Sequence, residues 1–299
     1  MMKSKGLLLA ALFLAALAVG CPSKEVAPTV PVRVLFAWNA GIPQPWFKDK
    51  VVAWDDIQSF TVTVTEISMT PKSAEGEGEG EGARWILFGG AQDVDLRRLD
   101  SVSEFMSERS VPALKYAKVG LRLANPRLVL KDAPDTVITE VRPTTRARLY
   151  ADVSIDLTNK KKPILMAVDF SDFLVVQTAS TAYDWTPALR ADISADNVKV
   201  EATGYAESVE AASALIMLNS NGAKMQVNCT NAQVHASDGS EEETGTMNDL
   251  RLGMQITVTG KLYTNAYLDA EDILISPAAP SASSTPSTLP IPSIIPSDT

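Results

Sequence analysis

Alternation of apolar and polar residues, repeated along most of the chain, is the feature that most constrains its fold. The clearest run is LYADVSIDL at residues 149–157, in which every odd position is apolar. Residues 60–65 and 253–260 repeat the pattern with valine, isoleucine and threonine. A period of two places successive side chains on opposite faces of an extended strand, so one face packs on a core and the other meets water. The sequence therefore predicts an all-β protein of antiparallel strands.

A short helix is the one exception that the pattern predicts, and it begins near residue 101. Ser101 and Glu104 have the spacing of a capping box, in which each side chain accepts a hydrogen bond from the other residue's backbone amide. The apolar residues of segment 102–106 would share one face of this helix, and Pro112 would stop it. We therefore expect one or two helical turns inserted in a β domain.

Two tight turns are predicted in the second half of the chain. Asn221-Gly222 lies between two strand-like segments and is typical of a type I′ hairpin, which needs positive φ at both central residues. Asn265-Ala266 is expected to connect the last two strands. Beyond them, residues 277–299 are rich in serine, proline and threonine without core-forming periodicity, and we interpret them as a disordered tail.

A cysteine follows a short apolar leader at the start of the chain. Lys3 and Lys5 precede an unbroken apolar run at residues 7–19, and small residues lead up to Cys21. This is the composition of a secretory signal peptide, and the run is shorter than the roughly 20 apolar residues that cross a bilayer. The position of Cys21 resembles the lipobox of bacterial lipoproteins. That resemblance implies cleavage after residue 20 and attachment of a diacylglyceryl lipid, with acyl chains such as palmitate, at the Cys21 thiol.

Lipid attachment would make the membrane the first partner of this chain. Two or more acyl chains hold a protein stably at a bilayer, so we expect it in the cell membrane or outer membrane, facing the periplasm or the exterior. The alternatives are a cleaved secretory signal whose cysteine is incidental and an uncleaved leader that acts as the anchor. Removal of residues 1–20 shifts the formal charge from −9 to −11, because two lysines leave with it. An acidic chain without a basic, aromatic-rich cluster is not expected to bind nucleic acid.

Few residues of this chain are suited to catalysis. His235 is the only histidine, no Gly-x-Ser-x-Gly motif is present, and zinc catalysis needs two or three nitrogen or sulfur ligands. Two carboxylate pairs, Asp93 with Asp95 and Asp169 with Asp172, have spacings compatible with acid–base or metal chemistry but also with solvent-facing strands. We therefore predict that the protein is not an enzyme and has no catalytic residue, metal or cofactor.

Two further features favour structural interpretations. Cys229 has no disulfide partner if Cys21 is lipidated, and its alternating surroundings predict a small strand residue rather than a reactive thiol. The run EGEGEGEG at residues 75–82 combines glycine with mutually repelling carboxylates, which predicts an exposed loop at the end of a hairpin. Calcium binding is the alternative, but the run lacks the ligand spacing of an ordered calcium loop.

Three tryptophans gather early in the chain: Trp38, Trp46 and Trp54. On exposed loops their rings would stack on sugars and form a carbohydrate-binding platform. The alternative, which we favour, is that these rings cover one end of the β core. Trp85 and Trp185 lie in strand-like runs and are predicted core residues.

Two stretches of the chain resemble known domain families. Segments such as FTVTVTEISM at residues 60–69 and YDWTPAL at 183–189 make residues 32–192 similar to the domain-of-unknown-function 4382 family of bacterial and archaeal lipoproteins. The run LRLGMQITVTG at residues 250–260 makes 198–276 similar to the domain-of-unknown-function 5666 family, a small barrel that resembles the OB-fold. Neither resemblance implies a catalytic residue.

We accordingly expect an all-β, two-domain lipoprotein. Its expected parts are a signal peptide (1–20), a tether (21–31), a β-sandwich domain of transthyretin-like or carbohydrate-binding-like type with one short helix (32–194), a small OB-like β-barrel (195–276) and the tail (277–299). The predicted function is a non-enzymatic binding or scaffolding role at the cell envelope, with a glycan or an envelope protein as a further partner. An accessory carbohydrate-binding lipoprotein is the alternative, and an extracytoplasmic hydrolase is the hypothesis that the residues favour least.

Overall fold

A computed structural model describes residues 28–38, 51–72, 84–144, 148–194, 197–237 and 242–276. These residues are almost entirely β-strand, which confirms the all-β prediction, and the helical elements among them are three-residue 3-10 turns. The first part of the chain contains β1 Thr29–Phe36, η1 Trp54–Asp56, β2 Ile57–Pro71, β3 Trp85–Asp95, η2 Arg98–Asp100, β4 Ser103–Pro112, β5 Lys115–Leu130, β6 Ala133–Ile138, β7 Val141–Pro143, β8 Arg148–Asp156, β9 Ile164–Gln177 and β10 Tyr183–Ile193. The second part contains β11 Asn197–Glu210, η3 Ala211–Ser213, β12 Leu215–Ser220, β13 Ala223–Asn228, β14 Gln233–Ser237, β15 Glu242–Gly245, η4 Met247–Asp249, β16 Gln255–Tyr263 and β17 Tyr267–Ile275.

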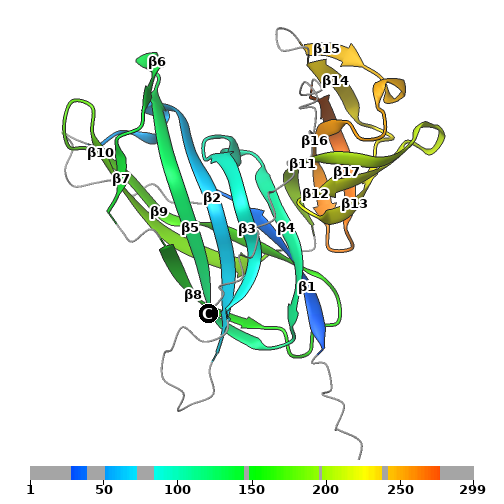
Figure 1. Ribbon diagram of the computed structural model, residues 1–299, viewed down its shortest axis with the longest axis horizontal. Helices are drawn as coiled ribbons and strands as arrows, with labels where there is room; N and C mark the ends of the chain where they lie inside the picture. The colour runs from blue at the N-terminus through cyan, green and yellow to red at the C-terminus, as the bar shows by residue number, and fades with distance from the viewer. Residues whose placement is uncertain are drawn as a thin grey trace, which may run out of the picture.

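Two layers of strands make up the first lobe, which we define as residues 28–194 (Figure 1). One layer has the order β3-β2-β5-β6, with β8 paired to β5, and the other has the order β4-β1-β9-β10-β7. The alternating apolar side chains of both layers point inward and form one buried core. Its largest fully buried side chains include Trp185, Tyr116, Phe36, Phe60 and Phe170.

Five strands close on one another in the second lobe, residues 197–276. Strand β11 pairs with β12, β12 with β13, β13 with β17, β17 with β16, and β16 returns to β11. The β14–β15 hairpin extends this ring from β17. At the β12–β13 turn, Asn221 and Gly222 have φ values of 50° and 81°, which confirms the predicted turn with positive φ at both central residues. The last two strands are joined through Asn265 and Ala266, also as predicted.

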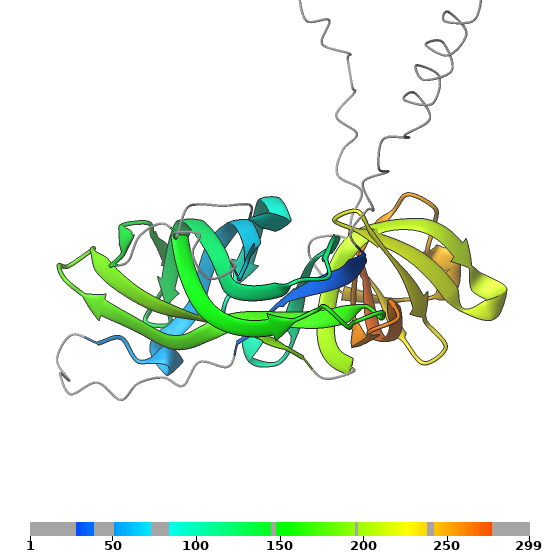
Figure 2. The same ribbon diagram turned by 90° about the horizontal axis from the view of Figure 1, so that it is seen from below.

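One layer of the first lobe is covered on both faces, because the second lobe packs against its outer side. Strand β11 pairs in parallel with β4, so a single sheet continues through both lobes. Leu35, Phe105 and Leu165, from β1, β4 and β9, are each fully buried and belong to the core of the second lobe. The two lobes therefore lie side by side as one elongated body (Figure 2).

The predicted helix at residues 101–106 is wrong: strand β4 begins at Ser103, and only the 3-10 turn η2 precedes it. The apolar spacing that looked helical has another cause. Phe105 packs into the core of the second lobe, whereas Met106 packs into the core of the first. Because these two adjacent residues face different cores, no polar position separates them and the period of two is interrupted there. Trp185 is buried as predicted, but Trp85 is 39% exposed and is not a core residue.

Closure of the ring requires glycine where neighbouring backbones approach closely. A Cβ atom at Gly260 would lie 2.1 Å from the backbone oxygen of Asp269, whereas one at Gly90 would lie 3.6 Å from the nearest side-chain atom, in Phe88. Gly260→Ala should therefore lower the free energy of unfolding by about 3 kcal/mol, because the backbone must shift to admit the methyl group. Gly90→Ala is the matched control, with a small expected effect. Urea unfolding checks the difference, and equal midpoints for the two variants would contradict this packing.

Candidate functional site

The tryptophans of the first lobe pack on one another rather than on solvent. The rings of Trp38, which follows β1, and Trp54, in η1, are stacked with centroids 4.2 Å apart and planes 6° apart. Phe173 contacts both rings edge-on. Trp54 is only 7% exposed, and Trp38 is partly buried. Trp46 lies outside the described residues.

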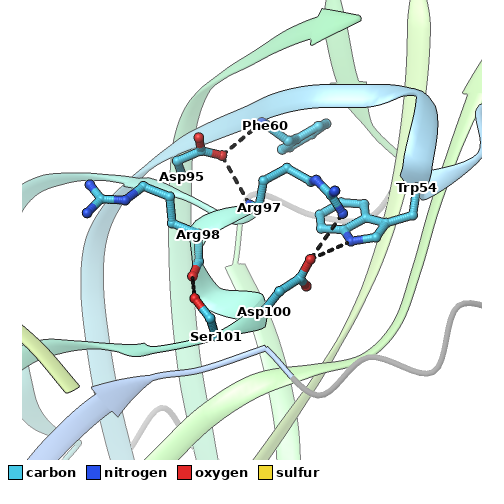
Figure 3. A network of polar contacts seen from close by, with 7 residues as sticks. All are labelled: Trp54, Phe60, Asp95, Arg97, Arg98, Asp100 and Ser101. Carbon is cyan, nitrogen blue, oxygen red and sulfur yellow. Dashed lines mark hydrogen bonds and ion pairs between the residues drawn. The ribbon is translucent and has the colours of Figure 1, made fainter. Parts of the chain in front are cut away.

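A polar network fixes the Trp54 ring from the side of η2 (Figure 3). The indole Nε1 donates a hydrogen bond of 3.2 Å to Oδ2 of Asp100, and Arg97 donates to the same oxygen at 3.0 Å. The Arg97 guanidinium lies over the Trp54 ring, 4.8 Å from its centroid. Asp95 holds the start of this turn, because its Oδ1 accepts the backbone amides of Phe60 and Arg97.

This packing leaves Trp54 without a face on which a sugar ring could stack. Trp38 covers one side of the indole, and Arg97 lies over the ring. The cavity beside it, lined by residues such as Val52, Trp54 and Phe173, has about 10 Å³ of accessible space, room for no more than about one water molecule. Among the described residues, the cluster therefore covers one end of the core, which is the alternative that the sequence left open.

A second polar cluster lies at the seam between the lobes, where β4 and β11 pair. The register places Glu104 beside Glu201. Arg98 forms an ion pair of 2.5 Å with Glu201, and Gln92 donates a hydrogen bond of 2.8 Å to Glu104. From the β12–β13 turn, Asn221 donates to the Gln92 side chain at 3.0 Å and to the backbone oxygen of Met106 at 2.8 Å. The ion pair of Arg98 with Glu201 and the hydrogen bonds of Asn221 to Gln92 and Met106 each join a residue of one lobe to a residue of the other.

Two carboxyl groups close together in a covered position cannot both be charged at low cost. Burial, and after it the neighbouring charge of Glu201, raise the pKa of Glu104 to about 7, against the opposing effects of Arg98 and Gln92. The seam can therefore hold or release a proton near neutral pH.

A buried arginine provides another contact across the seam. Arg33 of β1 is only 4% exposed and forms an ion pair of 2.6 Å with Glu108 of β4. Its guanidinium also donates a hydrogen bond to the backbone oxygen of Thr264, in the turn between β16 and β17. A buried charge needs such partners, so Arg33 links the fold of the first lobe to the position of the second.

The carboxylates predicted as acid–base candidates are held in structural contacts. The hydroxyl of Thr63 donates a hydrogen bond of 2.6 Å to Asp93, and Arg127 pairs with the same carboxylate. The Thr63 hydrogen bond is the largest cause of the lowered pKa of Asp93. Asp169 is buried and bound in a bidentate manner by Arg190, at 3.1 and 2.8 Å. The side chain of Asp172 lies outside the described part of the chain.

The remaining candidates lie in the second lobe, away from these carboxylates. His235, on β14, has its Nε2 3.8 Å from a carboxylate oxygen of Asp272 on β17. Cys229 directly follows β13 and is buried, and burial raises the pKa of its thiol to about 12. The thiol therefore stays protonated and unreactive at neutral pH. Among the described residues, no group of three or more His, Cys, Asp or Glu side chains is arranged to hold a metal ion.

Sequence reasoning missed the seam cluster of Glu104, Glu201 and Arg98. The spacing of Ser101 and Glu104 predicts a helix cap for Glu104, and no motif in the sequence marks Glu201. Glu104 and Glu201 lie about a hundred residues apart in the chain, so their pairing leaves no pattern in the neighbouring sequence of either residue. The only available signal was the apolar pair at residues 105–106, which is typical of a strand with two covered faces.

Comparisons with known proteins do not assign this chain to a family. No family model matches the chain, and no curated protein or solved structure is significantly similar to it. The resemblances to the two domain families described above therefore stay predictions. Within the described ranges, no helix is long and apolar enough to cross a membrane.

The seam predicts an unusual dependence of stability on pH. Glu104 holds its proton up to about pH 7 in the folded state but only to about pH 4.5 when unfolded, so the folded state binds more protons between these values. Stability should therefore fall as the pH rises through this window, by up to about 3 kcal/mol. Glu104→Gln, which keeps a hydrogen-bond acceptor for Gln92 but carries no charge, should flatten this slope and be more stable than the wild type above pH 7.

Urea unfolding at several pH values between these limits measures the slope. Glu271→Gln is the matched control, because Glu271 is exposed and pairs only at the surface with Lys199. This control should keep the wild-type slope. A Glu104→Gln variant whose slope equals that of the wild type would show that the seam carboxyl titrates like one in water.

Proposed function

We propose that this chain is a lipid-anchored cell-envelope protein with a non-enzymatic binding or scaffolding role. In this proposal the diacylglyceryl group on Cys21 holds the protein at a bacterial cell membrane or outer membrane. The two lobes then project into the periplasm or the exterior and hold a glycan or an envelope protein there. In this proposal the protein binds its partner through surface contacts and catalyses no reaction.

The observation that carries this proposal is the short distance in sequence between Cys21 and a folded body. The backbone oxygen of Pro28 already accepts a hydrogen bond of 2.8 Å from the amide of Ala113, so the fold begins seven residues after the cysteine. A lipid at Cys21 would therefore hold a continuous two-lobe body close to the bilayer. This arrangement suits a protein that positions a partner at a membrane.

The contacts of the candidate catalytic residues support a non-enzymatic role. Asp93 and Asp169 each have an arginine partner, and the thiol of Cys229 is buried. His235 lies in the other lobe from both carboxylates. Residues that act together in hydrolysis must meet around one substrate, and these residues come from separate elements.

The strand arrangement supports the finer assignments of fold. For the first lobe we propose a β-sandwich of transthyretin-like or carbohydrate-binding-like type, because two facing layers enclose one core. For the second lobe we propose an OB-like barrel. The closed ring of five strands, in which β13 and β17 are parallel, supports that assignment.

Substitution of Cys21 tests the anchor. Cys21→Ser should abolish incorporation of radiolabelled palmitate and move the protein from the membrane fraction to the soluble fraction, because no thiol remains to carry the lipid. Cys229→Ser is the matched control, and should keep both the label and the membrane location. Membrane retention of Cys21→Ser without any label would mean that the uncleaved leader is the anchor, which would contradict the proposal.

A further inference from the structure

Five exposed lysines gather at the end of the first lobe where the chain enters it. Lys72 lies at the end of β2, Lys115 at the start of β5, and Lys160, Lys161 and Lys162 in the loop between β8 and β9. We call this surface the lysine pole. The exposed side chain of Leu114, which is 41% accessible, lies among them.

Backbone hydrogen bonds hold the lysine pole together and join it to the entry point of the chain. The amide of Lys72 donates to the oxygen of Lys115 at 2.8 Å, and the amide of Leu157 donates to the oxygen of Leu114 at 3.0 Å. The amide of Lys160 donates to the oxygen of Leu157 at 3.1 Å, so the lysine loop turns back at this end. Ala113 in turn bonds to Pro28, and Figure 1 shows the start of β1 at the same end as the β4–β5 turn.

The charge of the lysine pole contrasts with the rest of the molecule. Among the described residues, the carboxylate that pairs with a lysine of the pole is Asp156, whose Oδ2 lies 3.4 Å from Nζ of Lys115. Residues 197–276, by comparison, hold eleven Asp and Glu against four Lys and Arg, a net charge of −7. An anionic surface would attract the lysine pole and repel the second lobe.

The tether limits which surface of the protein can meet the bilayer. Residues 22–28 can span at most roughly 25 Å when fully extended. The opposite end of the first lobe, at the turn after β5, lies up to roughly 50 Å away, because β5 has 16 residues. A lipid at Cys21 therefore keeps the lysine pole, and not the β5–β6 turn, within reach of the headgroups.

We propose that the lysine pole is a membrane-docking surface, at which the five lysines contact anionic phospholipid headgroups and Leu114 enters the interface between them. This inference rests on the proposed lipid anchor. Lysines near an anionic bilayer each add to the attraction, which salt screens. The first lobe would then stand end-on at the membrane.

Quenching of fluorescent labels by nitroxide-bearing headgroups tests this orientation. The native lipoprotein is reconstituted in vesicles of phosphatidylcholine with phosphatidylglycerol, with one label at Asn159→Cys or at Asp132→Cys. Both positions are exposed turns, one at the lysine pole and the other at the far end. The buried thiol of Cys229 does not compete for the label. We expect severalfold stronger quenching at residue 159 than at residue 132, and less of it in high salt or in phosphatidylcholine alone.

Charge removal provides the matched comparison. Lys160→Gln with Lys161→Gln and Lys162→Gln should lower the quenching at residue 159 severalfold. The triple control Lys131→Gln, Lys224→Gln and Lys261→Gln, which removes the same charge elsewhere, should not. Residues 75–82 carry four glutamates and belong to the connection between Lys72 of the pole and β3. They lie outside the described residues and stay in place in every variant.

Flotation of the vesicles separates a failure of the anchor from a failure of this inference. Protein that does not float with the vesicles contradicts the lipid anchor itself. Protein that floats but shows equal quenching at residues 159 and 132, or quenching that the lysine substitutions leave unchanged, overturns the docking surface and leaves the anchor standing.

Discussion

The rest of the structure depends on strand β4, which is covered on both faces and paired on both edges. On one edge it pairs with β1, and on the other with β11 of the second lobe. Phe105 faces one core and Met106 faces the other, and both are fully buried. Burial of side chains of this size contributes roughly 1.5–3 kcal/mol each. Neither core is complete without this strand, so the two lobes are joined by their packing as well as by the chain.

The same strand explains where sequence reasoning succeeded and where it failed. Strands with one solvent-exposed face, such as β8, show a clear alternation of apolar and polar residues. The glycine of the Asn221-Gly222 turn is explained by the positive φ that this turn requires. Both features were predictable from a few neighbouring residues. The identity of β4 was not, because its adjacent residues Phe105 and Met106 face two different cores, and one of these cores comes from a distant part of the chain. The same distance hid the meeting of Glu104 with Glu201.

The aromatic residues show a related limit of prediction. A cluster of tryptophans in sequence is compatible both with an exposed sugar platform and with a packed end of the core. Only the contacts separate these cases: Trp38 stacks on Trp54, and Asp100 accepts the indole hydrogen bond. The turn η2 that positions Asp100 also carries Arg98 to the seam. One short turn therefore contributes contacts both to the aromatic end of the first lobe and to the junction with the second.

The most direct test of the shared strand β4 is whether the two lobes unfold together. The four described tryptophans, Trp38, Trp54, Trp85 and Trp185, lie in the first lobe, so their fluorescence reports its unfolding. The reactivity of the buried Cys229 thiol reports the unfolding of the second lobe. Both signals should be followed in urea on the same sample of a Cys21→Ser variant, in which Cys229 is the single thiol. The shared strand predicts a single transition with one midpoint for the two probes. Two separate midpoints, with one lobe unfolding while the other stays intact, would contradict it.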